Sequence, residues 1–190
     1  MKESEPTGVE PGMTPALTAP PARRVDPDAF VAMVGEHDRL LRALVYRLVE
    51  DRDRMDDVLQ EVYLKAFRAL PGFRGEAGLG TWLYRIAYNV CMDELRRAGR
   101  WQPLPIDEAV DLPDAAPDPA DVASLRGDLA AALASLPPEQ RAAVLLVDLN
   151  GLDYAAAAEV LGIAAGTVGS RVSRARAALR LTLRPEGDTR

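Results

Sequence analysis

The stretch DYAAAAEVLGIAAGTVGSRVSRARAALRLTL, Asp153 to Leu183, decides how the second half of this 190-residue chain folds. Its apolar residues recur every three or four positions on both sides of Gly162, which predicts two helices. Glycine adopts the left-handed conformation of a tight turn without steric penalty. Small Ala158 lets the two helices approach closely, and Val168 packs the second helix onto the first. The spacing of Ala158, Gly162 and Val168 therefore predicts a helix-turn-helix motif.

The second helix of this motif, about Ala165 to Leu183, has two unlike faces. The apolar face carries Val168, Val172, Ala175 and Leu179, and the opposite side and first turn carry Thr167, Ser170, Arg171 and Arg174. Between Val160 and Pro185 there are five arginines and no acidic residue. The first residues of such a helix enter the major groove of DNA, and flanking arginines bind phosphates. A solvated polar face is the alternative for an arginine row, but the absence of acids favours DNA binding.

The net charge of the whole chain is −6, and its acidic residues gather outside the helix-turn-helix. Six acids lie between Glu50 and Glu61, and seven lie between Trp101 and Asp128. The basic end suits phosphates, whereas acidic stretches suit a basic protein surface. The asymmetry predicts more than one kind of partner.

Proline and composition divide the chain into segments. Residues 1–25 are rich in Pro, Gly, Thr and Glu without apolar periodicity and predict a disordered tail, as do residues 186–190. Prolines exclude a helix at residues 101–120 and predict a flexible acidic linker there. Helical periodicity over residues 26–100 and 121–185 predicts an all-α fold of two small domains, the first with three helices and the second with four.

Several residues at the ends and on the faces of these helices carry specific expectations. Thr81 and Asp121 are the expected N-caps of the third and fourth helices, and Pro137-Pro138 begins the fifth. Leu129 is expected to point inward from the fourth helix, whose apolar residues share its periodicity.

The composition argues against several classes of protein. The single cysteine, Cys91, and single histidine, His37, exclude an internal disulfide framework and a Cys/His zinc site. We expect Cys91 in the core, no metal, no cofactor and no enzymatic activity, since no nucleotide-binding loop or catalytic triad is found. No apolar run approaches the roughly 20 residues of a membrane span, and no signal-peptide pattern begins the chain, so a cytoplasmic location is expected.

The third helix of the first domain combines aromatic and basic side chains: Trp82, Tyr84, Arg85, Tyr88, Asn89, Arg96 and Arg97. Unstacked bases stack on aromatic rings and guanidinium planes, so this helix is a candidate surface for single-stranded nucleic acid. A core role for Trp82 is an equally good interpretation.

Two stretches of the chain together resemble a known family. The run DDVLQEVYLKAFRALPGFRGEAGLGTWLYRIAYNVCMDELRR, Asp56 to Arg97, resembles the second conserved region of bacterial sigma factors. The run LPPEQRAAVLLVDLNGLDYAAAAEVLGIAAGTVGSRVSRARAALRLTL, Leu136 to Leu183, resembles their fourth region. The two regions are joined by a short acidic linker with no third domain, which is similar to the extracytoplasmic-function (ECF) type. The resemblance covers about Phe30 to Leu183.

The resemblance implies a specificity factor that binds core RNA polymerase and promoter DNA and aids promoter melting. The clamp helices of the largest subunit would contact Asp56, Asp57, Gln60, Glu61 and Lys65. The melted minus-ten element would contact Phe73, Arg74, Gly75, Trp82, Arg85, Tyr88, Asn89, Arg96 and Arg97, with the glycines of residues 72–80 admitting a base closely. The minus-thirty-five element would contact Thr167, Ser170, Arg171, Arg174 and Arg176. The flap of the second-largest subunit and an anti-sigma factor are further implied partners.

Two departures from the family pattern lie in the helix-turn-helix. Gly169 stands where a basic residue is usual, and Ala164 stands where proline is usual. Gly169 removes a DNA contact and lowers helix propensity by about 1 kcal/mol relative to alanine. Two other functions therefore stay open: a regulator that binds duplex DNA without polymerase, and a degenerate sigma-like protein that occupies polymerase without reading promoters.

Overall fold

The computed structural model describes residues 26–75, 77–100 and 124–183, and every regular element in these ranges is helical. The first domain holds α1 (Pro27–Val49), α2 (Arg52–Ala69), the short 3-10 helix η1 (Leu70–Gly72) and α3 (Leu79–Arg97). The second domain holds α4 (Ser124–Ser135), α5 (Pro138–Val144), the π-helical turn η2 (Leu145–Leu149), α6 (Tyr154–Leu161) and α7 (Ala165–Thr182). The all-α expectation is confirmed. The predicted tails, the linker and the Asp121 cap lie outside the described residues.

The first domain is a three-helix unit in which α1, α2 and α3 each pack against the other two. The predicted apolar face of α1 is buried: Phe30, Val34, Leu41, Leu44, Val45 and Leu48. Asp26 and Asp51 cap α1 and α2 by accepting backbone N–H bonds in their first turns. Cys91 is fully buried, which confirms its place in the core, and burial raises the pKa of its thiol to about 12. The predicted cap at Thr81 is wrong, because α3 begins at Leu79 with Gly78 as its N-cap and Thr81 lies inside the first turn.

The second domain is organised around a buried arginine. Arg141 on α5 is 5% exposed and donates through Nη2 to the carbonyl oxygens of Ala134 and Leu136, each at 3.0 Å. These bonds satisfy carbonyls at the end of α4, which have no partner inside that helix. Pro137 is the N-cap of α5 and Pro138 its first residue, as predicted. Leu129 is 40% exposed, so its predicted inward orientation is wrong.

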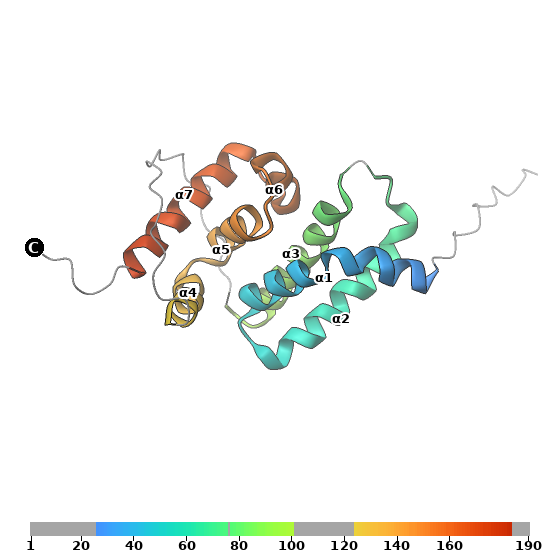
Figure 1. Ribbon diagram of the computed structural model, residues 1–190, viewed down its shortest axis with the longest axis horizontal. Coiled ribbons are helices and arrows are strands. Elements are labelled where there is room, and N and C mark those ends of the chain that lie inside the picture. The colour runs from blue at the N-terminus through green and yellow to red at the C-terminus, as the bar shows by residue number, and fades with distance from the viewer. Residues whose placement is uncertain (1–25, 76, 101–123, 184–190) are drawn as a thin grey trace, which may run out of the picture.

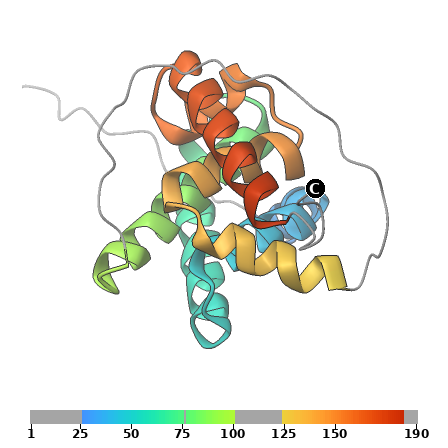
Figure 2. The same ribbon diagram turned by 90° about the vertical axis from the view of Figure 1, so that its left-hand side faces the viewer.

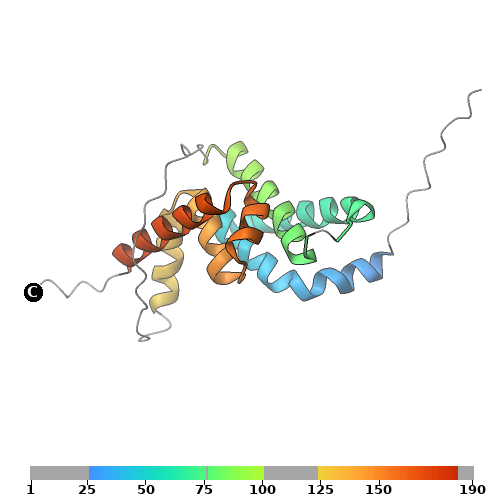
Figure 3. The same ribbon diagram turned by 90° about the horizontal axis from the view of Figure 1, so that it is seen from above.

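The two domains lie against each other rather than apart (Figure 1). α1 packs against α4 and α5, and α3 packs against α6. In the view from the side, α7 lies above α4 (Figure 2), and from above α6 is seen next to α3 (Figure 3). The sequence predicts two domains but not this contact, which depends on side chains far apart in the chain. No helix in the described ranges combines the length and apolar character that crossing a membrane needs.

Candidate nucleic-acid interface

The turn of the helix-turn-helix has the geometry that its sequence predicts. Gly162 adopts φ 67° and ψ 34°, a left-handed conformation, and its N–H donates to Ala158 O at 2.8 Å. The N–H of Ile163 donates to the same oxygen at 3.2 Å, which closes the end of α6. At the other end, Asp153 accepts from the Ala156 N–H at 2.7 Å and caps α6. Both ends of α6 are therefore fixed by named hydrogen bonds.

The recognition helix α7 buries the predicted apolar face, since Val168, Val172 and Ala175 are fully buried. Arg171 and Arg174 are half-buried. Ser170 is different from its expected place on the polar face, because it is 5% exposed. Its hydroxyl donates to Thr167 O at 2.9 Å, and Arg174 donates to the Ser170 hydroxyl and carbonyl oxygens, both at 3.3 Å. Ser170 thus orients Arg174.

Arg176 and Gly169 of α7 have neighbours on other elements that the helical periodicity of α7 does not predict. Arg176 makes a forked contact with Asp148 of η2, with Nε at 3.2 Å and Nη2 at 2.8 Å from the carboxylate oxygens. This pair ties α7 to η2. Gly169 faces the ring of Tyr154 at the start of α6, where an added Cβ would lie 3.6 Å from the nearest ring carbon.

The loop before α3 is fixed onto that helix by an aromatic pair. The rings of Phe73 and Trp82 lie 5.0 Å apart between centroids at an interplanar angle of 41°. Trp82 is half-buried and packs against the core, as the core interpretation predicts, and its contact with a base stays a prediction. Gly75 has φ +74°, a conformation that side chains rarely adopt.

Gly80 lies against the His37 ring of α1. A Cβ at this position would lie 3.1 Å from the His37 ring, a tight contact, so the close packing of α1 on α3 favours a residue without one. Glycine here serves the helix contact.

The predicted minus-ten surface of α3 is partly open and partly covered. Arg85, Asn89, Arg96 and Arg97 are exposed, and Tyr88 is half-buried. Arg96 pairs with Asp93, and Arg97 pairs with Glu94 at 3.2 Å. Burial raises the pKa of Tyr88, while Arg171 of the other domain opposes this shift and Glu139 adds to it.

One edge of the predicted minus-ten surface of α3 meets the turn of the helix-turn-helix across the domain contact. Arg85 and Ala77 line one side of a cleft whose other side is the helix-turn-helix, with Glu159, Gly162 and Ile163 among its residues. Tyr88 of α3 lies within electrostatic reach of Arg171 on α7.

The predicted polymerase surface on α2 is exposed at Asp56, Asp57, Gln60 and Lys65, and Glu61 is half-buried. Lys65 pairs with Glu61 at 2.9 Å, and Arg97 of α3 lies 3.6 Å from the same carboxylate. The hydrogen bond from Lys65 holds the pKa of Glu61 below its usual range, although burial opposes this. Leu64 is 47% exposed beside them and was not predicted. Its signal in the sequence is an apolar residue outside the buried stripe of α2.

Known proteins provide the decisive comparison. The model of sigma-70 region 2 matches residues 33–100, and the model of sigma-70 region 4 matches residues 126–179. The chain is 38% identical over 151 residues to the ECF RNA polymerase sigma factor SigM of Mycobacterium tuberculosis, covering 80% of this chain and 75% of that protein. The chain belongs to the ECF family of RNA polymerase sigma factors. It is a sigma factor that binds core polymerase and directs promoter-specific transcription initiation.

Further relatives agree with this assignment. The ECF sigma-E factor of Escherichia coli is 34% identical over 171 residues, covering 84% of this chain and 89% of that protein. The structure of CnrH in complex with the cytosolic domain of CnrY matches with TM-score 0.63 and 26% identity over 83% of this chain and 89% of that one. The sigma factor RpoE of Bartonella quintana, solved with the anti-sigma factor NepR, matches with TM-score 0.62 and 31% identity over 82% and 94%. Sigma factors are in general DNA-recognition proteins without enzymatic activity.

Proposed function

We propose that this ECF sigma factor reads a two-part promoter with the surfaces described above. The first turn of α7 with Arg171 and Arg174 binds the minus-thirty-five element as duplex, and α3 with residues 73–75 binds the melted minus-ten element. The observation that carries the proposal is the presence, in one chain, of a capped helix-turn-helix and of an α3 surface that joins aromatic and basic side chains.

Within α7 the described contacts divide the work among the arginines. Arg171 and Arg174 bind DNA, and Thr167 lies at the start of the helix where it enters the groove. Ser170 positions Arg174 through the two 3.3 Å bonds rather than touching a base itself. Arg176 holds α7 in place through Asp148, so its share of DNA binding is small.

In the first domain, Trp82 stacks on an unpaired base and Phe73 supports its ring. Tyr88, Arg85 and Asn89 continue the same surface along α3, and Arg74 and Gly75 border it from the loop. Arg96 and Arg97, near the end of α3, bind backbone phosphates after leaving their acidic partners.

The exposed α2 surface binds the clamp helices of the largest polymerase subunit, with Asp56, Asp57, Gln60, Glu61 and Lys65 as the polar contacts and Leu64 as an apolar one. The second domain contacts the flap of the second-largest subunit. Since the similar sigma factor RpoE of Bartonella quintana was solved with the anti-sigma factor NepR, an anti-sigma factor is a further proposed partner. The protein acts in the cytoplasm, where polymerase and DNA meet, and carries out no catalysis itself.

Run-off transcription with purified core polymerase tests this assignment. Arg174→Ala should weaken closed-promoter binding by roughly tenfold and lower the salt slope by about 1, as expected for one lost arginine contact to DNA. Arg39→Ala, an exposed arginine on α1, is the matched control and should leave both quantities unchanged. Equal effects of the two substitutions would contradict the assignment of α7.

Binding and footprinting measurements separate the remaining alternatives. Tight, sequence-specific duplex binding by the wild-type protein alone would favour a regulator that works without polymerase. Polymerase binding without initiation at any cognate promoter would favour a degenerate sigma-like protein. Trp82→Ala should preserve polymerase binding and abolish permanganate reactivity at minus-ten thymines, whereas Trp82→Phe should retain most of it.

A further inference from the structure

We propose that Glu50 of the first domain and Arg141 of the second form a polar latch that keeps the free chain closed. In the closed chain α6 covers part of α3, with Arg171 of α7 near Tyr88, and these surfaces separate when the latch opens. The masking part of this proposal rests on the promoter surfaces assigned above, whereas the latch itself rests only on the contacts of these two residues.

Arg141 joins the domains through one buried guanidinium group. Its Nη2 atom holds the end of α4, as described above, and its Nη1 atom points to the first domain. There Nη1 donates to Arg47 O at 3.2 Å and to the Glu50 carboxylate. The side chain of Arg141 is 6% exposed and that of Glu50 is 36% exposed. The contact therefore lies at the edge of the interface, where water reaches one of its two partners.

The backbone of Glu50 gives an independent reason to assign a role to its side chain. Glu50 is the C-cap of α1 with φ 59°, and among the described residues it is the one non-glycine with a positive φ. Its N–H donates to Tyr46 O at 3.1 Å, and glycine or asparagine fits such a helix end better. A glutamate here carries a conformational cost, and the contact with Arg141 is what its side chain gains. Strain of this kind is characteristic of functional positions.

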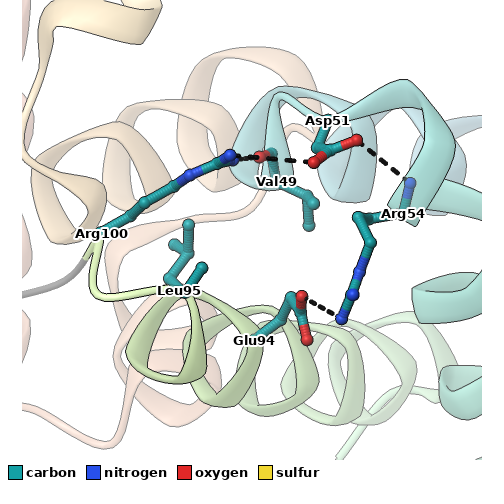
Figure 4. Close-up of a pocket in the computed structure, with 7 residues that line it drawn as sticks. Val49, Asp51, Arg54, Glu94, Leu95 and Arg100 are labelled. Carbon is teal, nitrogen blue, oxygen red and sulfur yellow. Dashed lines mark hydrogen bonds and ion pairs between the residues drawn. The ribbon is translucent and has the colours of Figure 1, made fainter.

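Contacts inside the first domain fix the turn between α1 and α2, in which Glu50 lies (Figure 4). Arg100 donates to Val49 O at 3.5 Å and lies 3.8 Å from the Asp51 carboxylate. Asp51 accepts from the backbone N–H of Arg54 at 3.2 Å, and the Arg54 guanidinium pairs with Glu94 of α3 at 2.6 Å. The residues on both sides of Glu50 are thus fixed to α2 and α3, and its side chain is directed outward to Arg141.

The charges of the pair suit a contact that must open. Burial lowers the pKa of Arg141 and raises the pKa of Glu50, so each charge loses hydration in the closed chain. Removing the carboxylate leaves a buried guanidinium without its counter-charge, and this penalty disappears when the domains separate and water reaches Arg141. Loss of Glu50 therefore favours the open chain.

Substitutions at Glu50 test the latch without touching the carbonyl contacts of Arg141 inside its own domain. Glu50→Gly removes the carboxylate and relieves the positive φ, so the substitution adds no backbone strain at the end of α1. Glu50→Lys places a like charge against Arg141. Glu36→Lys is the matched control, because Glu36 is an exposed residue of the same helix and the substitution changes the charge equally.

Small-angle X-ray scattering of the full chain and duplex-promoter binding by the free protein are the two measurements. We expect Glu50→Gly and Glu50→Lys to increase the radius of gyration and to strengthen promoter binding at least threefold, with Glu36→Lys like wild type. An unchanged radius of gyration in both Glu50 variants would overturn the latch. A larger radius with unchanged promoter binding would overturn the masking. Run-off transcription by the wild-type protein with core polymerase tests the proposed function separately, since it measures promoter-dependent initiation and not the arrangement of the domains in the free chain.

Discussion

Gly169→Ala should stabilise the second domain, although it changes a residue inside the recognition helix. Gly169 lies within α7, and it is not among the glycines with a positive φ. Replacing a mid-helix glycine by alanine gains about 0.5–1 kcal/mol. The new methyl group would lie 3.6 Å and 3.8 Å from two carbons of the Tyr154 ring, an ordinary van der Waals separation. Half-burial of one methyl adds about 0.4 kcal/mol, given about 0.8 kcal/mol for a fully buried one.

The expected gain in the free energy of unfolding is therefore about 1 kcal/mol, or roughly 4–8 °C in Tm if the domain unfolds on its own. Urea denaturation followed by circular dichroism measures it. Gly162→Ala is the opposite control, because φ +67° at the turn should cost about 1–2 kcal/mol for any residue with a Cβ. A loss of stability in Gly169→Ala would refute the placement of Gly169 against Tyr154 in a regular helix.

Three further substitutions have defined outcomes. Gly169→Lys should steepen the salt dependence of promoter binding by about 0.9 if the restored basic residue reaches one phosphate, measured by binding titrations at several salt concentrations. Asp148→Asn should reduce stability by at most about 1 kcal/mol, since this ion pair is partly exposed, and should leave promoter binding equal or tighter in a filter-binding assay. Tyr63→Phe should flatten the alkaline loss of stability, because burial and the bond to Asp38 raise the pKa of Tyr63 from 10.0 to about 12. The folded chain then keeps a proton that the unfolded chain loses, so wild-type stability falls as pH rises from 10 to 12 and the variant lacks this part, as urea midpoints at pH 9, 10 and 11 should reveal.

Periodicity and turn chemistry predict most of the local structure of this chain. Gly162 takes its left-handed turn, Pro138 begins α5, and the apolar face of α7 is buried because these choices depend on neighbours within a few residues. Thr81 was a plausible cap by residue type, but the chain begins α3 earlier, at Leu79. Leu129 follows the helical period and is nevertheless exposed, since periodicity gives a face without saying what covers it.

The site was less predictable wherever long-range contacts decide the role of a side chain. A helical wheel counts Arg176 with the DNA-facing arginines, yet Asp148 is 28 residues away and takes up its guanidinium fork. Ser170 has a polar side chain, which suggests an exposed position, but it is buried and its hydroxyl accepts a hydrogen bond from Arg174. Gly80 resembles a residue that admits a base, but its neighbour is the His37 ring of another helix. Each of these depends on a partner that no local pattern contains.

Contacts within the domains and contacts between them differ in kind, which explains how the free chain can be closed and still open to bind a promoter. Contacts inside each domain are largely apolar and fixed, such as the buried stripe of α1, whereas the Glu50–Arg141 contact between domains is polar and half open to water. The packing of α6 against α3 brings the domains together, and the polar pair adds a contact that is lost as soon as one partner is removed. Polymerase binding at the exposed α2 surface leaves that pair untouched, so the opening must come from whatever competes for α3 or α6. Promoter DNA and the second contact with polymerase are the candidates that the positions of Tyr88 and Arg171 favour, because both side chains are at the covered side.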